Sequence, residues 1–102
     1  MIQYNLSLFI EPSIESEAKL ALSKIIIPEL RKFEGIQQIY LFGIDSHQEK
    51  DSLGLSLQFW IHPEKENELT VEITEIISSF FQAEFPNQYV YFPSKLSLIQ
   101  TN

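Results

Sequence analysis

The chain has 102 residues, of which 44% are hydrophobic and 21% charged, a composition typical of one globular domain spanning residues 1–102. It contains no cysteine, which excludes disulfides, thiol catalysis and cysteine-ligated metal centres. Its acidic net charge of −7 repels phosphate backbones, so we expect no nucleic-acid partner.

The first segments predict a strand followed by a long helix. Residues Ile2–Ile10 alternate between apolar and other side chains, the pattern of a half-buried strand. A helix is then expected from an N-cap at Ser13 to about Phe33, either kinked or divided into two helical pieces where Pro28 cannot bond back to a carbonyl. Its core-facing stripe is predicted to contain Ile14, Ala18, Ala21, Leu22 and Ile25, and after a small rotation to continue with Ile26, Leu30 and Phe33.

Two further strands are predicted in the middle of the chain. Residues Ile36–Ile44 carry apolar side chains on both faces, and the polar segment Asp45–Ser52 is typical of a hairpin loop. Residues Leu53–Ile61 alternate again, with leucine, phenylalanine and isoleucine facing the core. The side chains expected on the other face of this strand are Gly54, Ser56, Gln58 and Trp60.

A second helix and a last strand complete the chain. The helix is predicted to begin at His62-Pro63, to carry glutamates in its first half and to stop at Pro86. The last strand is expected over Tyr89–Ile99, at an edge of the sheet or with a bulge, because Pro93 has no amide hydrogen to donate. Its predicted core-facing residues are Val90, Phe92, Leu96 and Leu98.

The resulting order, β-α-β-β-α-β, predicts an α+β fold, the ferredoxin-like two-layer sandwich. In this fold a four-stranded antiparallel sheet carries two helices on one face, with the strands in the order 4-1-3-2. The start of the chain lacks a signal-peptide pattern, and no apolar run could span a bilayer. We therefore expect a cytoplasmic protein that makes no membrane contact.

The sheet face without helices is the main candidate for function. Its predicted centre is polar and consists of Asn5, Ser7, Ser56 and Gln58, surrounded by aromatic side chains that include Tyr40, Trp60 and Tyr91. Because exposed aromatic surface usually marks an interface, we expect a homodimer through this face. The enclosed polar centre could bind a small molecule, or its groups could hydrogen-bond across the interface and hold nothing.

Two weaker constellations favour ordinary structural roles. Acidic residues alternate with His47 in the predicted hairpin loop, but without the glycine and terminal glutamate of a calcium loop, so we expect no metal there. His62 could act as an acid or base near Trp60, although a His-Pro pair at this position is more typical of a local helix cap. No cofactor motif is present, and the catalytic residues, if there are any, are unknown.

Four segments carry a resemblance to a known family. They are Met1–Ser7, Ile27–Leu30, Leu55–Phe59 and Phe85–Leu96. They resemble, in order, the patterns M-I-x-Y-N-V-T, H-I-P-E-V-L, Y-S-V-Q-Y and F-G-x-x-F-V-A-F-R-T-x-L of an uncharacterised bacterial family, a domain of unknown function. The resemblance implies a ferredoxin-like fold of the dimeric α/β-barrel type and implies no activity.

The sequence departs from this family at two positions, since Ile26 stands where histidine is common and Pro93 where arginine is common. The wider barrel type includes small monooxygenases, some of which use asparagine, tryptophan and a histidine on a helix. Asn5 and Trp60 resemble two of these groups, but neither histidine of the chain is predicted on a helix.

Three hypotheses therefore stay open from the sequence. The first is a dimeric module without catalysis that binds a small molecule or is purely structural. The second is a monooxygenase-like enzyme that uses Asn5, Trp60 and His62. The third is a domain that recognises another protein.

Overall fold

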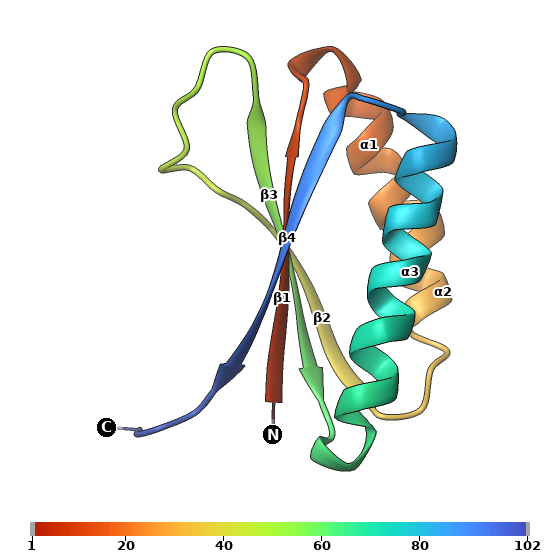
Figure 1. Ribbon diagram of the computed structural model, residues 1–102, viewed down its shortest axis with the longest axis vertical. Helices are drawn as coiled ribbons and strands as arrows, with labels where there is room; N and C mark the ends of the chain where they lie inside the picture. The colour runs from red at the N-terminus through yellow and green to blue at the C-terminus, as the bar shows by residue number, and fades with distance from the viewer. Residues whose placement is uncertain (1, 102) are drawn as a thin grey trace.

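The computed structural model describes residues 2–101, in which one antiparallel sheet carries all helices on a single face (Figure 1). The strands lie in the order β2-β3-β1-β4, which confirms the predicted ferredoxin-like topology. The elements in chain order are β1 (Ile2–Ile10), η1 (Pro12–Ile14), α1 (Glu15–Ala21), η2 (Leu22–Ile26), α2 (Ile27–Leu30), β2 (Ile36–Gly43), β3 (Leu53–Ile61), η3 (Pro63–Lys65), α3 (Glu66–Glu84) and β4 (Tyr89–Ser97).

Strands β1 and β3 form the centre of the sheet and supply much of the core. They pair antiparallel with Leu6 opposite Leu57, and both of these side chains are completely buried under the helices. Phe59 lies on the same face, where Phe81 and Ile77 of α3 are also fully buried. The period-two alternation read from the sequence is confirmed along both strands.

The first helical stretch differs from its prediction at its start and in its middle. The predicted Ser13 cap is wrong, because a 3-10 turn begins at Pro12 and the residue that precedes it, Glu11, makes no side-chain cap. Farther along, residues 22–26 form a π-helical turn, in which the amide of Ile27 reaches back five residues to the carbonyl of Leu22.

This wide turn accommodates Pro28 without ending the helix, and it changes which side chains face the sheet. A π-helical turn contains one extra residue, so the apolar stripe rotates by about 100°. Ile26 is fully buried, as predicted, whereas Ile25, which was also predicted to face the core, is 55% exposed.

Strand β4 lies at an edge, as Pro93 predicted, but its two faces are exchanged relative to the prediction. Its register with β1 places Tyr91 opposite Leu8 and therefore on the helical face. Val90, Phe92 and Leu96 point to the open face, so their predicted core positions are wrong. Leu98 lies beyond the strand and is 67% exposed.

The faces of β4 are exchanged because tyrosine fits the boundary between α3 and the solvent better than phenylalanine does. The Tyr89 ring packs on Phe81, while its hydroxyl donates to Gln82 Oε1 at 3.1 Å near the surface. Tyr91 stacks against Tyr89 with the ring centroids 6.5 Å apart. A tyrosine can bury its aromatic ring and keep its hydroxyl in contact with solvent, and hydropathy alone does not show this.

One residue determines the local geometry of each of two connections, and the predicted cap at His62 is confirmed. Gly35 has a φ of 99°, and a Cβ there would lie 2.8 Å from Lys65 Cγ, so only glycine fits this helix exit. His62 precedes α3 and accepts the Glu64 amide through Nδ1 at 3.3 Å, which makes it a local cap. Among residues 2–101, no helix has both the length and the apolar character needed to cross a bilayer.

We predict that Leu57→Ala lowers the free energy of unfolding by about 2–5 kcal/mol, because it removes a buried side chain and leaves a cavity in the core. The matched control is Leu20→Ala on α1, whose side chain is 61% exposed, with an expected change within about 0.5 kcal/mol. Urea denaturation monitored by circular dichroism measures both. Equal effects of the two substitutions would contradict the core described here.

Candidate functional site

The open face of the sheet carries a continuous track of hydrogen-bonded polar side chains. Gln3 donates to Gln58 Oε1, and Gln58 donates to Ser56 Oγ at 3.2 Å. Ser56 donates to Asn5 Oδ1, and Asn5 Nδ2 donates to Ser7 Oγ at 3.0 Å. The track therefore crosses between β1 and β3 twice and connects all four residues predicted for the polar centre.

Position along the two central strands explains this track. Asn5 is directly opposite Gln58, and Ser7 is directly opposite Ser56, so their side chains share one face at cross-strand distance. Ser56 is buried, with 6% of its surface exposed, although it lies on the face without helices. Its neighbours cover it, and its hydroxyl both donates and accepts within the track.

Apolar side chains flank the polar track on both edge strands. Each of them is between 42% and 57% exposed: Tyr40 and Phe42 on β2, and Val90, Phe92 and Leu96 on β4. Phe92 also contacts Phe9 edge-on, with the ring centroids 5.8 Å apart. The exchanged faces of β4 thus make this surface more apolar than the sequence predicted.

Six of the seven residues predicted for the site share the open face. Tyr40 and Trp60 lie on it together with the polar track, since Tyr40 pairs with Gln58 in the β2–β3 register. The placement of Tyr91 on this face was wrong, because β4 directs it toward α3. Sequence reasoning missed Val90, Phe92 and Leu96 here, and only the register of β4 could have identified them.

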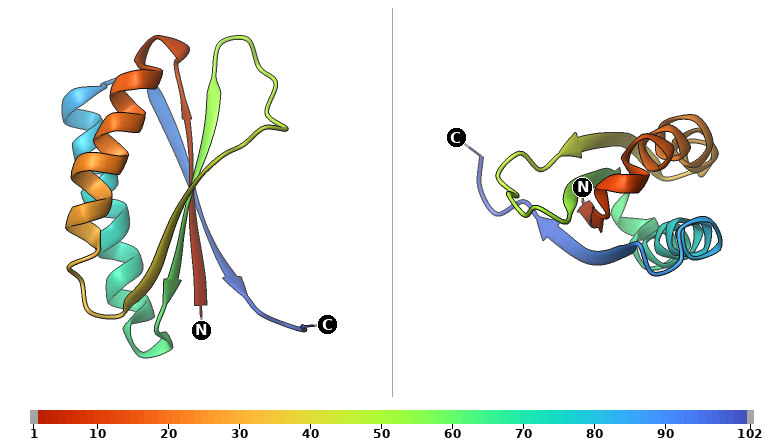
Figure 2. Two further views of the ribbon diagram at one scale, coloured as in Figure 1. Left: turned by 180° about the vertical axis from the view of Figure 1, so that it is seen from behind. Right: turned by 90° about the horizontal axis from the view of Figure 1, so that it is seen from above.

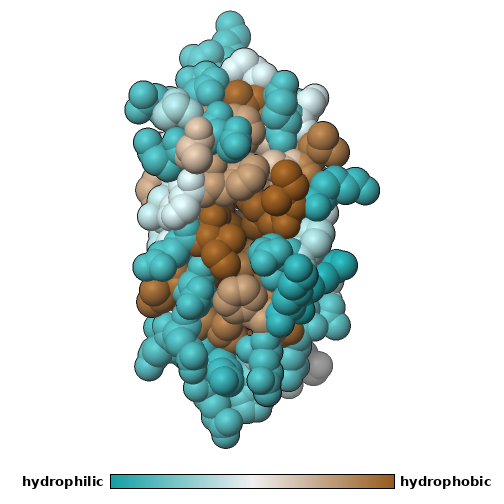
Figure 3. Space-filling model, turned by 90° about the vertical axis from the view of Figure 1, so that its right-hand side faces the viewer, coloured by the Kyte–Doolittle hydropathy of each residue, from teal (hydrophilic) through white to brown (hydrophobic). Residues whose placement is uncertain are grey.

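The helical side also has exposed apolar residues, which lie on the helices and not on the strands. Leu20, Ile25 and Val71 are each more than half exposed. Figure 3 shows apolar surface gathered along the middle of this side, with polar atoms around it. This side therefore serves as a comparison surface for any interface assigned to the open face.

The two histidines do not form a catalytic or metal-binding arrangement with their neighbours. His47 bonds Ser52 within the β2–β3 loop and its ring packs against Phe9, with centroids 4.8 Å apart. His62 is exposed and caps η3. Within residues 2–101, no three histidine or acidic side chains are grouped as a metal would need.

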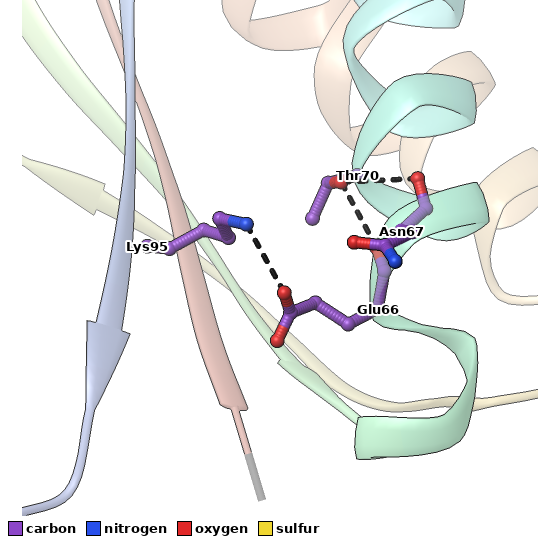
Figure 4. Close-up of polar contacts among 4 residues, drawn as sticks. All are labelled: Glu66, Asn67, Thr70 and Lys95. Carbon is purple, nitrogen blue, oxygen red and sulfur yellow. Dashed lines mark hydrogen bonds and ion pairs between the residues drawn. The ribbon is translucent and has the colours of Figure 1, made fainter.

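A groove lies between β4 and α3 on the helical side. This groove has a volume of about 430 Å³ and is lined by Tyr4, Thr70, Val71, Thr74, Glu75, Pro93, Ser94 and Lys95. At the β4 side, Lys95 Nζ forms an ion pair with Glu66 Oε2 at 3.0 Å across the gap between the two elements (Figure 4). No pattern in the sequence indicates this groove, because the groove depends on how β4 is oriented.

Comparisons with solved structures support the fold. The chain is similar to a dimeric ferredoxin-like protein from an uncultured marine organism, with TM-score 0.63 and 9% identity over 100% of this chain and 98% of that one. It is also similar to an "ethyl tert-butyl ether d (ethd) family protein" from Bacillus halodurans, with TM-score 0.63 and 10% identity over 92% and 97% of the two chains.

A third similar structure is SnoaB, a cofactor-independent oxygenase from Streptomyces nogalater, with TM-score 0.59 and 9% identity over 98% and 95%. No family model matches the chain, and no curated protein matches it either. At these identities the likeness shows a ferredoxin-like fold and nothing about activity. The resemblance to an uncharacterised bacterial family therefore stays a prediction.

We predict that Ser56→Ala lowers the free energy of unfolding by about 1–3 kcal/mol, because it leaves Asn5 Oδ1 without its donor and Gln58 Nε2 without its acceptor. The control is Ser94→Ala on β4. This exposed serine lies on the same face of the sheet as Ser56, and the expected change is within about 0.5 kcal/mol. Urea titration at one protein concentration measures both variants. If Ser56→Ala is as neutral as the control, the track contributes nothing to stability.

Proposed function

We propose that the chain is a homodimeric module, structural or ligand-binding rather than catalytic, that pairs with a second copy through the open sheet face. The observation that carries the proposal is the row of exposed apolar side chains on both edge strands, with Tyr40 and Phe42 on one side and Phe92 and Leu96 on the other. Large exposed apolar side chains gathered on one face are typical of an interface. Burying this face against an identical surface would remove these side chains from water.

The polar track supports the same proposal because it can be buried without leaving its groups unsatisfied. Side-chain amides and hydroxyls are costly to bury unless they are hydrogen-bonded. Here Asn5, Ser56 and Gln58 already bond one another within one chain. This arrangement favours a structural role for the track, and small-molecule binding at the track stays a prediction.

The dimensions of the face are also suitable for a dimer. Four strands of eight or nine residues cover roughly 20 by 30 Å at standard strand spacing and rise. With side-chain relief this approaches the roughly 800 Å² per partner that stable complexes bury. Figures 1 and 2 show the β2–β3 loop and the C-terminal segment projecting beyond the sheet on this side, where they can contact a partner.

The C-terminal projection carries apolar residues that have no partner within the described chain. Leu98 is 67% exposed and Ile99 is 96% exposed. A second copy seated on the open face would offer these side chains a surface to contact. The similar marine protein is described as dimeric, which is consistent with this use of the fold.

The oxygenase alternative has no comparable support from the site. Asn5 uses both its carbonyl and its amide within the polar track, and His62 caps a helix at the surface. In the register of β1 and β3, Trp60 lies opposite Gln3 and not opposite Asn5. The likeness to SnoaB is one of fold, so this alternative rests on analogy.

We predict that the chain sediments at twice its mass of 11.9 kDa and that Phe92→Glu shifts it to the monomer. A buried, unpaired carboxylate at the interface costs several kcal/mol, which weakens a micromolar dimer by more than 100-fold. Tyr40→Glu, on the opposite edge of the same face, is expected to act in the same way. Sedimentation velocity over a concentration series measures both variants.

The matched control is Leu20→Glu on the helical side, where an equally exposed apolar residue receives the same charge. It is expected to leave the dimer intact. A monomeric wild-type chain would contradict the proposal. The open sheet face would then be expected to bind a different protein. A dimer broken by Leu20→Glu and not by Phe92→Glu would assign the interface to the helical side.

A further inference from the structure

The groove between β4 and α3 lies on the other layer of the molecule from the open face, and it has the size of a small-molecule site. Its volume of about 430 Å³ falls within the range of about 300–1,000 Å³ that is typical of ligand pockets. The register of β4 explains why it exists. Tyr89 and Tyr91 fill the space beside α3, whereas the next residue on this face is the small ring of Pro93.

The polar atoms that line the groove are mostly hydrogen-bond acceptors. Thr74 Oγ1 donates its only proton to the carbonyl of Thr70 at 2.7 Å, so the hydroxyl of Tyr4 must donate to Thr74. Thr70 Oγ1 likewise donates to the carbonyl of Glu66 at 2.9 Å, and more weakly to that of Asn67 at 3.3 Å (Figure 4). The oxygens of Tyr4 and Thr70 therefore keep free lone pairs but no free proton.

The charges around the groove, like its acceptor oxygens, favour a ligand that donates hydrogen bonds. Among the described residues that line it, Lys95 is the only cation, and its ammonium forms an ion pair with Glu66 at 3.0 Å. Glu75 lies at the rim and forms no ion pair with any residue in the described part of the chain. One carboxylate is therefore left over in a groove whose remaining surface is largely apolar.

We propose that this groove binds a small organic amine, in which an apolar body carries a protonated ammonium group. The ammonium has three protons to donate and no lone pair, which complements the acceptor oxygens of Tyr4 and Thr70 and the charge of Glu75. The apolar body would contact Val71, Pro93 and the ring of Tyr4. A carboxylate ligand would meet the acceptor oxygens and the negative charge of Glu75, and Lys95, the one cation among the described lining residues, is already paired with Glu66.

The test uses tryptamine as the probe and titrates it into the isotopically labelled protein. We expect saturable amide shifts concentrated at Thr70, Val71, Thr74 and Lys95 in two-dimensional NMR spectra. The matched ligand is 3-indolepropionate, which keeps the ring and replaces the ammonium by a carboxylate. It is expected to produce no saturable shift at the same residues.

Two variants locate the interaction. Glu75→Gln is expected to weaken tryptamine binding roughly two- to fivefold, the usual effect of one solvent-exposed charge contact. Glu72→Gln, an exposed glutamate of α3 that does not line the groove, is the control and is expected to leave the affinity unchanged. Val71→Arg, at a residue that is 55% exposed, places a cation in the groove and is expected to abolish binding.

Three outcomes would overturn the inference. They are equal or tighter binding of 3-indolepropionate, equal effects of Glu75→Gln and Glu72→Gln, and no saturable shift at up to about 10 mM tryptamine, tenfold above a weak Kd of about 1 mM. The result is independent of the proposed dimer, because the groove is on the helical side. The Phe92→Glu variant, titrated in parallel, is expected to bind tryptamine as the wild type does.

Discussion

The antiparallel pairing of β1 with β3 is the interaction on which the rest of the structure depends. These strands pair over nine positions, and their alternation places Leu6 and Leu57 in the core while Asn5 and Gln58 occupy the open face. A slip of one residue would move the polar side chains into the core and the leucines to the surface. The hydrogen bonds of the polar track thus reinforce a register that the apolar face already determines.

This dependence explains why the central part of the fold could be predicted from the sequence. In β1 and β3, hydropathy and geometry agree at nearly every position, because one face packs against helices and the other does not. The topology followed from the order of the elements. The four polar residues of the open face were identified because they share those two strands, although their hydrogen bonds to one another could not be read from the pattern.

The predictions that were wrong concern elements in which a single residue changes which side chains face the core. The π-helical turn before Pro28 rotates the helix, so that Ile25 is exposed although it was predicted to face the core. In β4, hydropathy favours Phe92 over Tyr91 for the core, yet the edge position lets tyrosine rings pack on α3 and keep their hydroxyls near water. The groove was invisible to sequence reasoning because it follows from the exchanged faces of β4.

Strand β4 therefore connects the two surfaces that the proposals use. Phe92 presents its ring to the open face, and the adjacent Pro93 lines the groove on the opposite side. Since neighbouring strand residues point to opposite faces, one register serves both surfaces, and changing it would abolish both. Two features hold that register: Tyr89 is anchored on Phe81, and Lys95 is bonded to Glu66. An edge strand restrained at both ends in this way can present an interface on one face and a binding groove on the other.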